Sequence, residues 1–270
     1  MNREALLPAV VEIARDAGRV ILEIYDRDFE VVAKGDGSPL TEADRAADAL
    51  IHERLRALTP DVPILSEESV GIDYATRRAW TRFWLVDPLD GTKEFVNRNG
   101  QFTVNIALIE NGKPALGAVT VPVSGVSYYA AAGRGATRRD ADGRTAALAV
   151  RRYTGGPATV VVSRSHRGMA VDRFLAALAQ REGEYRTTDM GSSLKLCLVA
   201  EGAADVYPRL GPTSEWDVAA GHCIVDAAGG RVIDLHGRPL VYNKENILNP
   251  WFLACGAGDY DWTGCFDGVG

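Results

Sequence analysis

Two aspartates, Asp87 and Asp90, lie in a segment that could bind a metal ion and a phosphate together. They belong to the run Trp-Leu-Val-Asp-Pro-Leu-Asp-Gly-Thr-Lys-Glu-Phe at positions 84–95. The apolar stretch before them is typical of a buried strand, and Asp87-Pro88 indicates that this strand ends there. Two carboxylates on such a turn suit a hard divalent cation, which prefers several oxygen ligands. Gly91 and Thr92 then open a segment that could start a helix, where unpaired N–H groups attract phosphate.

Two further acidic segments could complete a site of this kind. Glu67 and Glu68 follow an apolar stretch, and because neighbouring side chains on a strand face opposite ways, only one of them is expected to enter a given site. Asp217 lies at the start of a helix, and the small residues that follow at 219–221 predict close packing. Each segment also has a simpler interpretation: an exposed loop pair for the glutamates, and an aspartate favoured by the helix dipole for Asp217. Their combination with the aspartate turn favours the metal site.

The elements that must position these residues are helices and strands in alternation, which predicts a layered α/β fold. Apolar residues recur at three- and four-residue steps over residues 6–24 and 43–58, so two amphipathic helices are expected. Thr41 and Asp44 are suited to the N-cap and first turn of the second helix, and Pro60 ends it. Strands are predicted at 83–86, 102–109, 115–121, 128–131, 160–163, 205–207, 232–233 and 252–254, and further helices at 171–179, 192–200 and 216–228.

A polar region rich in glycine and arginine, residues 137–157, divides the chain into two parts. Residues 1–145 are predicted to form an α+β half that carries the metal- and phosphate-binding residues. Residues 146–270 are predicted to form an α/β half that recognises the substrate.

The composition is that of a soluble globular protein. The chain has 270 residues, of which 46% are hydrophobic and 24% charged, so one large domain or two modest ones can form. The net charge of −6 argues against a nucleic-acid or anionic-membrane partner. The four cysteines show no CxxC pairing and are expected to be reduced thiols of a cytosolic protein. No signal peptide or transmembrane segment is visible, and the oligomeric state, monomer or homodimer, stays open.

Together these segments resemble the lithium-sensitive, magnesium-dependent phosphatase superfamily, which includes inositol monophosphatases and fructose-1,6-bisphosphatases. The resemblance covers nearly the whole chain and extends in particular to the bacterial 3'(2'),5'-bisphosphate nucleotidases. It implies an αβαβα sandwich fold. The runs that carry it are Leu-Ser-Glu-Glu at 65–68, the stretch from Trp84 to Gly117, Ser-Arg-Ser-His at 163–166, Gly-Ser-Ser-Leu-Lys at 191–195, Tyr-Pro-Arg-Leu-Gly-Pro at 207–212 and Trp216-Asp217.

The resemblance also implies a role for each site residue. Two or three Mg²⁺ ions would be bound, with Li⁺ as an inhibitor, by the side chains of Glu67, Asp87, Asp90 and Asp217 and the carbonyl of Leu89. Asp44 and Thr92 would orient the attacking water, and the amides of Gly91 and Thr92 would hold the phosphate that is cleaved. Four residues are candidates for binding the rest of a bisphosphate nucleotide: His166, Ser192, Lys195 and Arg209.

The reaction implied by the resemblance is hydrolysis of adenosine 3',5'-bisphosphate to AMP and phosphate, and also of its sulfated analogue PAPS, by a metal-activated water. An inositol monophosphatase is the alternative, because it shares the metal ligands and the mechanism. A non-catalytic metal-binding module would lack a ligand or the Asp–Thr pair, and the sequence has both. The expected location is the cytoplasm, with peripheral association at the cytoplasmic face of the inner membrane as a further expectation.

Overall fold

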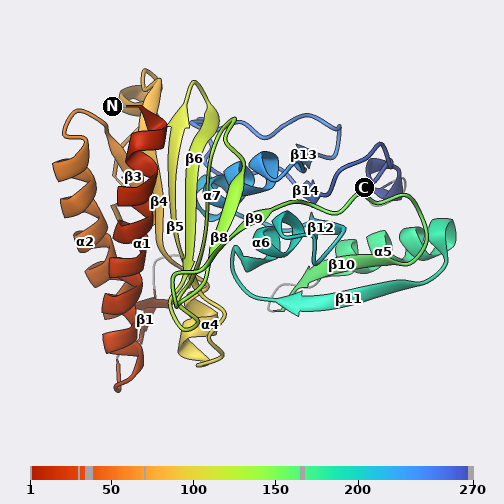
Figure 1. Cartoon of the computed structure of the whole chain (residues 1–270), viewed down its shortest axis with the longest axis horizontal. Coiled ribbons are helices and arrows are strands. Elements are labelled where there is room, and N and C mark those ends of the chain that lie inside the picture. Colours follow the sequence, from red (N-terminus) through yellow and green to blue (C-terminus); the bar gives the residue numbers. More distant parts are fainter. Residues whose placement is uncertain (1, 30, 34–38, 70, 165–167, 267–270) are drawn as a thin grey trace.

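Helices and strands alternate in five layers (Figure 1). The computed structural model describes residues 2–29, 31–33, 39–69, 71–164 and 168–266. Across the molecule, the layers are a helix pair, a seven-stranded sheet, a second helix pair, a five-stranded sheet and one further helix. The predicted layered α/β fold and the αβαβα sandwich are therefore confirmed.

The outer helix pair forms where the apolar periodicity predicts it. Helices α1 (Arg3–Tyr25) and α2 (Glu42–Leu58) pack their buried sides on one face of the seven-stranded sheet. At the start of α2, the Thr41 hydroxyl oxygen accepts the N–H of Ala43 at 3.2 Å, and the N–H of Thr41 donates to Asp44 at 2.8 Å. This capping box pairs groups that a helix end would otherwise leave unsatisfied. It also fixes the Asp44 side chain. A short antiparallel ribbon, β1 (Val31–Ala33) and β2 (Pro39–Thr41), precedes the helix.

The seven-stranded sheet carries the aspartate turn. Its strands lie in chain order, and β3 and β4 are parallel whereas the other neighbours are antiparallel. The strands are β3 (Ile64–Ser66), β4 (Arg82–Asp90), β5 (Thr103–Glu110), β6 (Lys113–Val121), β7 (Val126–Ala131), β8 (Ala136–Arg139) and β9 (Thr145–Leu148). Three short helices connect them: η1 (Glu67–Ser69), α3 (Tyr74–Arg77) and α4 (Thr92–Val96).

Two features of this sheet differ from the sequence prediction. The strand expected to end at Asp87 continues to Asp90, because a shift of register against β5 bends the strand without ending it. The polar region after residue 136 adds β8 and β9 to the sheet. The side chains of β9 are mostly exposed, so its sequence lacks the alternation that marks a half-buried strand.

The five-stranded sheet has the order β11-β10-β12-β14-β13. Its strands are β10 (Ala158–Ser163), β11 (Tyr185–Met190), β12 (Val206–Arg209), β13 (Arg231–Asp234) and β14 (Phe252–Cys255), and its helices are α5 (Met169–Glu182), α6 (Leu194–Ala200), α7 (Glu215–Ala227) and η2 (Thr263–Phe266). Strand β11 was not predicted, because it is a largely exposed edge strand of polar sequence. Trp262 and Cys265 near the C-terminal end of the described chain are buried beside α5.

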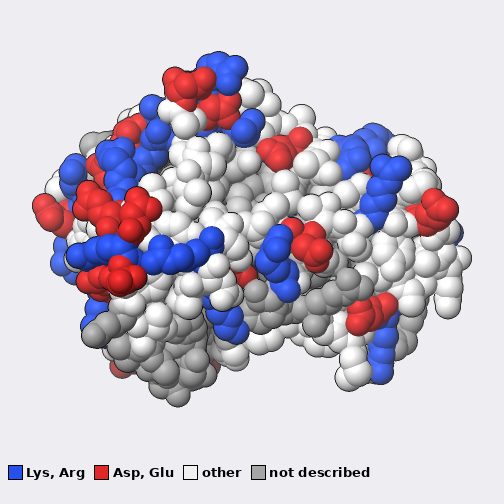
Figure 2. Space-filling model, turned by 90° about the horizontal axis from the view of Figure 1, so that it is seen from below, with Lys and Arg blue, Asp and Glu red and all other residues white. Residues whose placement is uncertain are grey.

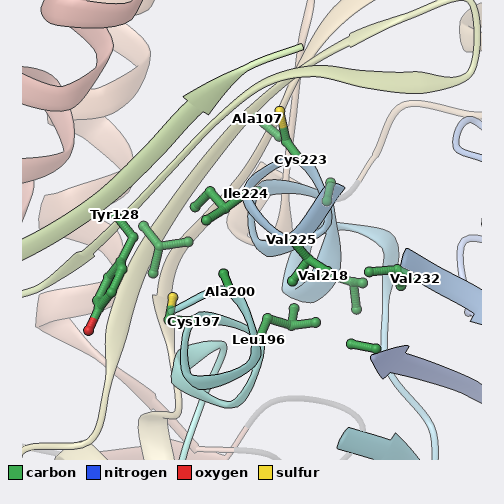
Figure 3. Packing of buried hydrophobic residues seen from close by; sticks show 14 of the residues in the cluster. Ala107, Tyr128, Leu196, Cys197, Ala200, Val218, Cys223, Ile224, Val225 and Val232 are labelled. Carbon is green, nitrogen blue, oxygen red and sulfur yellow. The ribbon is translucent and has the colours of Figure 1, made fainter. Parts of the chain in front are cut away.

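Helices α6 and α7 fill the space between the two sheets (Figure 3). Strand β6 packs closely against the middle of α7. A Cβ atom added to Gly117 on β6 would lie 2.4 Å from the carbonyl oxygen of Ala220 on α7. The prediction that the small residues after Asp217 allow close packing is thus confirmed. One buried apolar cluster includes residues of both sheets, so the two halves of the chain share a core. The predicted division of function, with metal and phosphate binding in residues 1–145 and substrate recognition in residues 146–270, stays a prediction.

Candidate metal and phosphate site

Three carboxylates from three separate segments converge at one end of β4. Oxygen atoms of Glu67, Asp87 and Asp217 all lie within 4.8 Å of one another. Glu67 begins η1 directly after β3, which runs parallel to β4, so these two strands deliver their acidic residues to the same edge of the sheet. Asp217 reaches the group from the first turn of α7, where it forms a capping box with Ser214. Helix α7 therefore brings the C-terminal half of the chain to the carboxylate cluster.

Asp90 lies in the same pocket but outside this group of three carboxylates. One of its oxygens accepts the backbone N–H of Ser193 at 2.5 Å and the side-chain amide of Asn105 at 3.3 Å. The Ser193 hydroxyl in turn donates to Asn105 Oδ1 at 2.8 Å. Asp90 is therefore held by β5 on one side and by the residue before α6 on the other.

The electrostatics of this cluster call for positive charge. Burial, followed by the charges of Glu67 and Asp90, raises the pKa of Asp87 well above its ordinary value. Burial, followed by the charges of Asp90 and Glu67, raises the pKa of Asp217 to about 8. Among the described residues, Asp87 Oδ2 is buried without a hydrogen-bond donor. Three clustered carboxylates with an unsatisfied buried oxygen fit divalent cations that take oxygen ligands.

Thr92 and Asp44 meet beside the cluster. The Thr92 hydroxyl donates to Asp44 Oδ1 at 3.3 Å, and the Leu89 carbonyl oxygen lies at the same distance from it. The other Asp44 oxygen is occupied, since it accepts both the N–H and the hydroxyl of Thr41, at 2.8 and 2.6 Å. Gly91, with φ of 90°, provides the left-handed backbone that turns β4 into α4. The capping box of α2 thus orients Asp44 toward Thr92.

Three of the four predicted nucleotide-binding residues line the same cavity of about 590 Å³. Ser192 has a left-handed backbone, φ 46°. The Lys195 ammonium is buried, donates to the Ser192 carbonyl at 2.5 Å and lies 5.6 Å from the centre of the Tyr207 ring. Burial lowers the pKa of Lys195 to about 8, against the opposing charge of Asp90. Arg209 donates to the carbonyl of Pro212 at 2.7 Å. The fourth residue, His166, lies outside the described residues.

Two residues that hold Asp90 were not identified from the sequence. Ser193 and Asn105 connect the two halves of the chain at the site, and Thr103 joins them through a 2.8 Å contact between hydroxyl groups. A signal was available for Asn105, because a polar side chain within an otherwise apolar strand needs a buried partner. Ser193 gives no such signal, since its partners are about 90 residues away in the sequence.

The surface near this end of the molecule carries both signs of charge. Figure 2 shows Lys and Arg side chains interspersed with Asp and Glu side chains on the described part of the face seen from below. A nucleic-acid-binding protein typically gathers its basic residues in one patch or stripe. None of the described helices is both long and apolar enough to cross a membrane.

Comparisons with known proteins agree on one family. The sequence model of the inositol monophosphatase family matches residues 2–252. The 3'(2'),5'-bisphosphate nucleotidases CysQ of Escherichia coli K12 and Salmonella typhimurium are 50% and 52% identical over 250 residues, which are 92% of this chain and 98% of theirs. A crystal structure of CysQ from Bacteroides thetaiotaomicron superposes with a TM-score of 0.81 at 42% identity, over 93% of this chain and 97% of that one. The inositol monophosphatase of Anabaena gives a TM-score of 0.76 at 26% identity, over 98% and 96%.

Proposed function

The chain belongs to the inositol monophosphatase family, and from this premise we propose that it is a 3'(2'),5'-bisphosphate nucleotidase that hydrolyses adenosine 3',5'-bisphosphate to AMP and phosphate. PAPS, which has the same 3'-phosphate, is the second proposed substrate. The observation that carries this choice is the difference in identity between two solved relatives of the same fold. Identity is 42% with a CysQ but 26% with an inositol monophosphatase, over more than nine-tenths of the chain in both cases.

The carboxylate cluster is proposed to hold two or three Mg²⁺ ions. Glu67, Asp87 and Asp217 would supply carboxylate ligands, and Asp90 with the Leu89 carbonyl would complete the oxygen donors. Mg²⁺ bound there would offset the negative charge of the phosphate and lower the pKa of water. Few protein ligands per ion suffice, because Mg²⁺ keeps several waters and takes substrate oxygens. The raised pKa values of Asp87 and Asp217 support this assignment, since burial and then the neighbouring carboxylates raise them, and bound cations would stabilise the charged carboxylates.

Thr92 and Asp44 are proposed to orient the water that attacks phosphorus. A hydroxyl can donate one proton and accept others, so Thr92 can donate to Asp44 while accepting a hydrogen bond from the water. Because Thr41 occupies the second oxygen of Asp44, the carboxylate offers its remaining oxygen to Thr92. Deprotonation of the water is favoured by this fixed chain of acceptors. The amides of Gly91 and Thr92 would stabilise the phosphate as charge shifts in the transition state.

The C-terminal half is proposed to select the substrate. One cavity is lined by the carboxylate cluster and also by Ser192, Lys195 and Arg209, which bring hydroxyl and cationic groups to it. Lys195 would act as a fixed charge and not as a mobile arm, because its ammonium is already anchored on the Ser192 carbonyl. His166 is retained as a fourth candidate on the resemblance alone.

A substrate panel tests this function. The purified protein with Mg²⁺ would be assayed for phosphate release from adenosine 3',5'-bisphosphate, inositol 1-phosphate and fructose 1,6-bisphosphate, with and without Li⁺. We expect kcat/KM to be highest for the nucleotide, and Li⁺ to inhibit. A higher kcat/KM for inositol 1-phosphate would replace the proposal with the inositol monophosphatase alternative.

A further inference from the structure

Two apolar side chains on one loop line the active-site cavity and have no part in the proposed chemistry. Ile247 and Leu248 lie in the segment 243–249, which forms neither helix nor strand, and Leu248 is 47% exposed. The residues that line the cavity also include Trp216 and Phe252. These side chains give the cavity an apolar wall beside its carboxylates and cations, as in ligand sites whose apolar walls carry a few placed polar groups.

The first end of this segment is fastened by a buried carboxylate. Glu215 is fully buried and accepts the backbone N–H groups of Asn243 and Lys244 at 2.8 and 2.9 Å. It also pairs with the Lys244 ammonium at 2.6 Å. From the other side, Arg77 donates to the carbonyls of Lys244 and Glu245 at 2.6 and 2.8 Å. Removing the charges of Glu215 and Lys244 from water costs free energy, and the backbone hydrogen bonds that Glu215 accepts offset that cost.

The second end is fastened to the residues that precede α7. Asn249 donates its N–H to the Thr213 carbonyl and its side-chain amide to the Ser214 carbonyl, at 2.8 and 2.7 Å. The N–H of Glu215 donates to the Ile247 carbonyl at 2.9 Å. The segment is therefore held at both ends against the helix start that carries Asp217. Fixed in this way, the backbone that carries the two apolar side chains does not need to be ordered when a ligand binds.

We infer that Ile247 and Leu248 bind the nucleobase of the substrate, and that Glu215 is the residue that positions them. The inference rests on the proposed function. A nucleoside bisphosphate combines anionic phosphates with a flat, largely apolar base, and the cavity combines a charged wall with these apolar side chains. A cavity of about 590 Å³ is within the range that holds ligands of nucleotide size. An inositol ring, which carries polar groups on each carbon, would gain little from contact with a leucine.

Comparison of a substrate with and without the base tests this inference. Leu248→Ala would be assayed on adenosine 3',5'-bisphosphate and on ribose 3,5-bisphosphate, which lacks the base. We expect the ratio of kcat/KM for the two substrates to fall about tenfold, chiefly through KM for the nucleotide, as for loss of a modest apolar contact. Val241→Ala is the matched control, because Val241 is 54% exposed just before the segment and is not among the cavity-lining residues. It should leave both substrates unaffected.

A mutant cycle tests the role of Glu215. If Glu215 acts through Ile247 and Leu248, Glu215→Ala should lower the same ratio, and adding it to the variant Ile247→Ala/Leu248→Ala should cause no further fall. An unchanged ratio in Leu248→Ala would overturn the inference for the base, and a further fall when Glu215→Ala is added would overturn the role of Glu215. If the unaltered protein hydrolyses ribose 3,5-bisphosphate or inositol 1-phosphate but not the nucleotide, the proposed function fails and the inference fails with it.

Discussion

The Asp44 carboxylate links the helix that begins beside it to the proposed chemistry. One of its oxygens is committed to the Thr41 cap and the other faces the Thr92 hydroxyl. The same side chain is thus a first-turn helix residue and a candidate catalytic group. The first interpretation follows from the sequence pattern and the second from the family resemblance, and the geometry is compatible with both.

Removal of the Thr92 hydroxyl should slow the chemical step. We expect Thr92→Ala to lower kcat by a factor on the order of 10²–10⁴, the usual contribution of positioned proton-transfer groups. KM should change much less, because the hydroxyl is proposed to bind the water and not the leaving group. Steady-state phosphate release measures both constants. Thr92→Ser keeps a hydroxyl and is the control, so an equal loss of kcat in the serine variant would contradict the assigned role.

The residues that could be predicted at this scale are those that belong to short motifs. Asp87 and Asp90 share one turn, and Asp217 begins a helix, so their residue types and neighbours were informative. The contacts made by Ser193 and Asn105 could not be predicted, because each depends on the folded path of the other half of the chain. His166 keeps its role only as a prediction.

Among the elements, α7 couples packing to the site. It fills the space between the sheets and its first turn carries Asp217. The close approach of β6 to this helix depends on Gly117, where any side chain would meet the helix backbone. A protein interior at crystal-like density has no room for the extra atom.

One methyl group at this contact should therefore disturb both stability and activity. We expect Gly117→Ala to lower the free energy of unfolding by about 1–3 kcal/mol, as overpacking does, and to reduce activity because Asp217 moves with the helix. Urea denaturation and phosphate release would measure the two effects. Gly71→Ala is the control, since Gly71 lies outside the helices and strands and an added Cβ there meets no atom within 4 Å. Equal stability of the two variants would show that α7 tolerates a shift at this contact.

Elements with a clear periodicity were predictable, and elements defined by pairing were not. Helices α1 and α2 present apolar stripes that can be recognised in the local sequence. Strand β11 and strands β8 and β9 have largely polar or exposed side chains and form because neighbouring strands offer hydrogen-bond partners. Such pairing is a non-local property.

For the whole molecule, the acidic cluster makes folding depend on pH when no metal is bound. Burial and the nearby carboxylates raise the pKa of Asp217 from 3.8 to about 8 in the folded protein. Between these values the folded state keeps a proton that the unfolded chain releases. This group therefore contributes its full stability below about pH 4, and the contribution is lost as the pH rises through about 8.

This linkage can be measured in the protein stripped of metal with EDTA. Between about pH 6 and about pH 8, the free energy of unfolding should fall more steeply for the unaltered protein than for Asp217→Asn. Asparagine keeps an acceptor for the N–H of Ser214, which donates to Asp217 at 2.9 Å, so the cap is retained. Mg²⁺ should remove the difference between the two slopes. Parallel slopes without metal would contradict the assigned protonation.

At the same scale, the overall fold could be predicted but the meeting of the two halves could not. Alternating patterns and the family resemblance led to the layered sandwich. That Ser193 and Asp217 reach the C-terminal end of β4 from the second half follows only from the three-dimensional path. The same path places Ile247 and Leu248 in the cavity, although they lie some 150 residues beyond the end of that strand.

The central claim is that an oriented water cleaves the 3'-phosphate of a nucleotide at this cluster, and an isotope experiment tests it most directly. Adenosine 3',5'-bisphosphate would be incubated with the protein and Mg²⁺ in ¹⁸O-labelled water, and the products identified by mass spectrometry. The account predicts 5'-AMP without label and inorganic phosphate that carries one ¹⁸O atom. Label in the nucleotide, release of the 5'-phosphate or the absence of hydrolysis would contradict it.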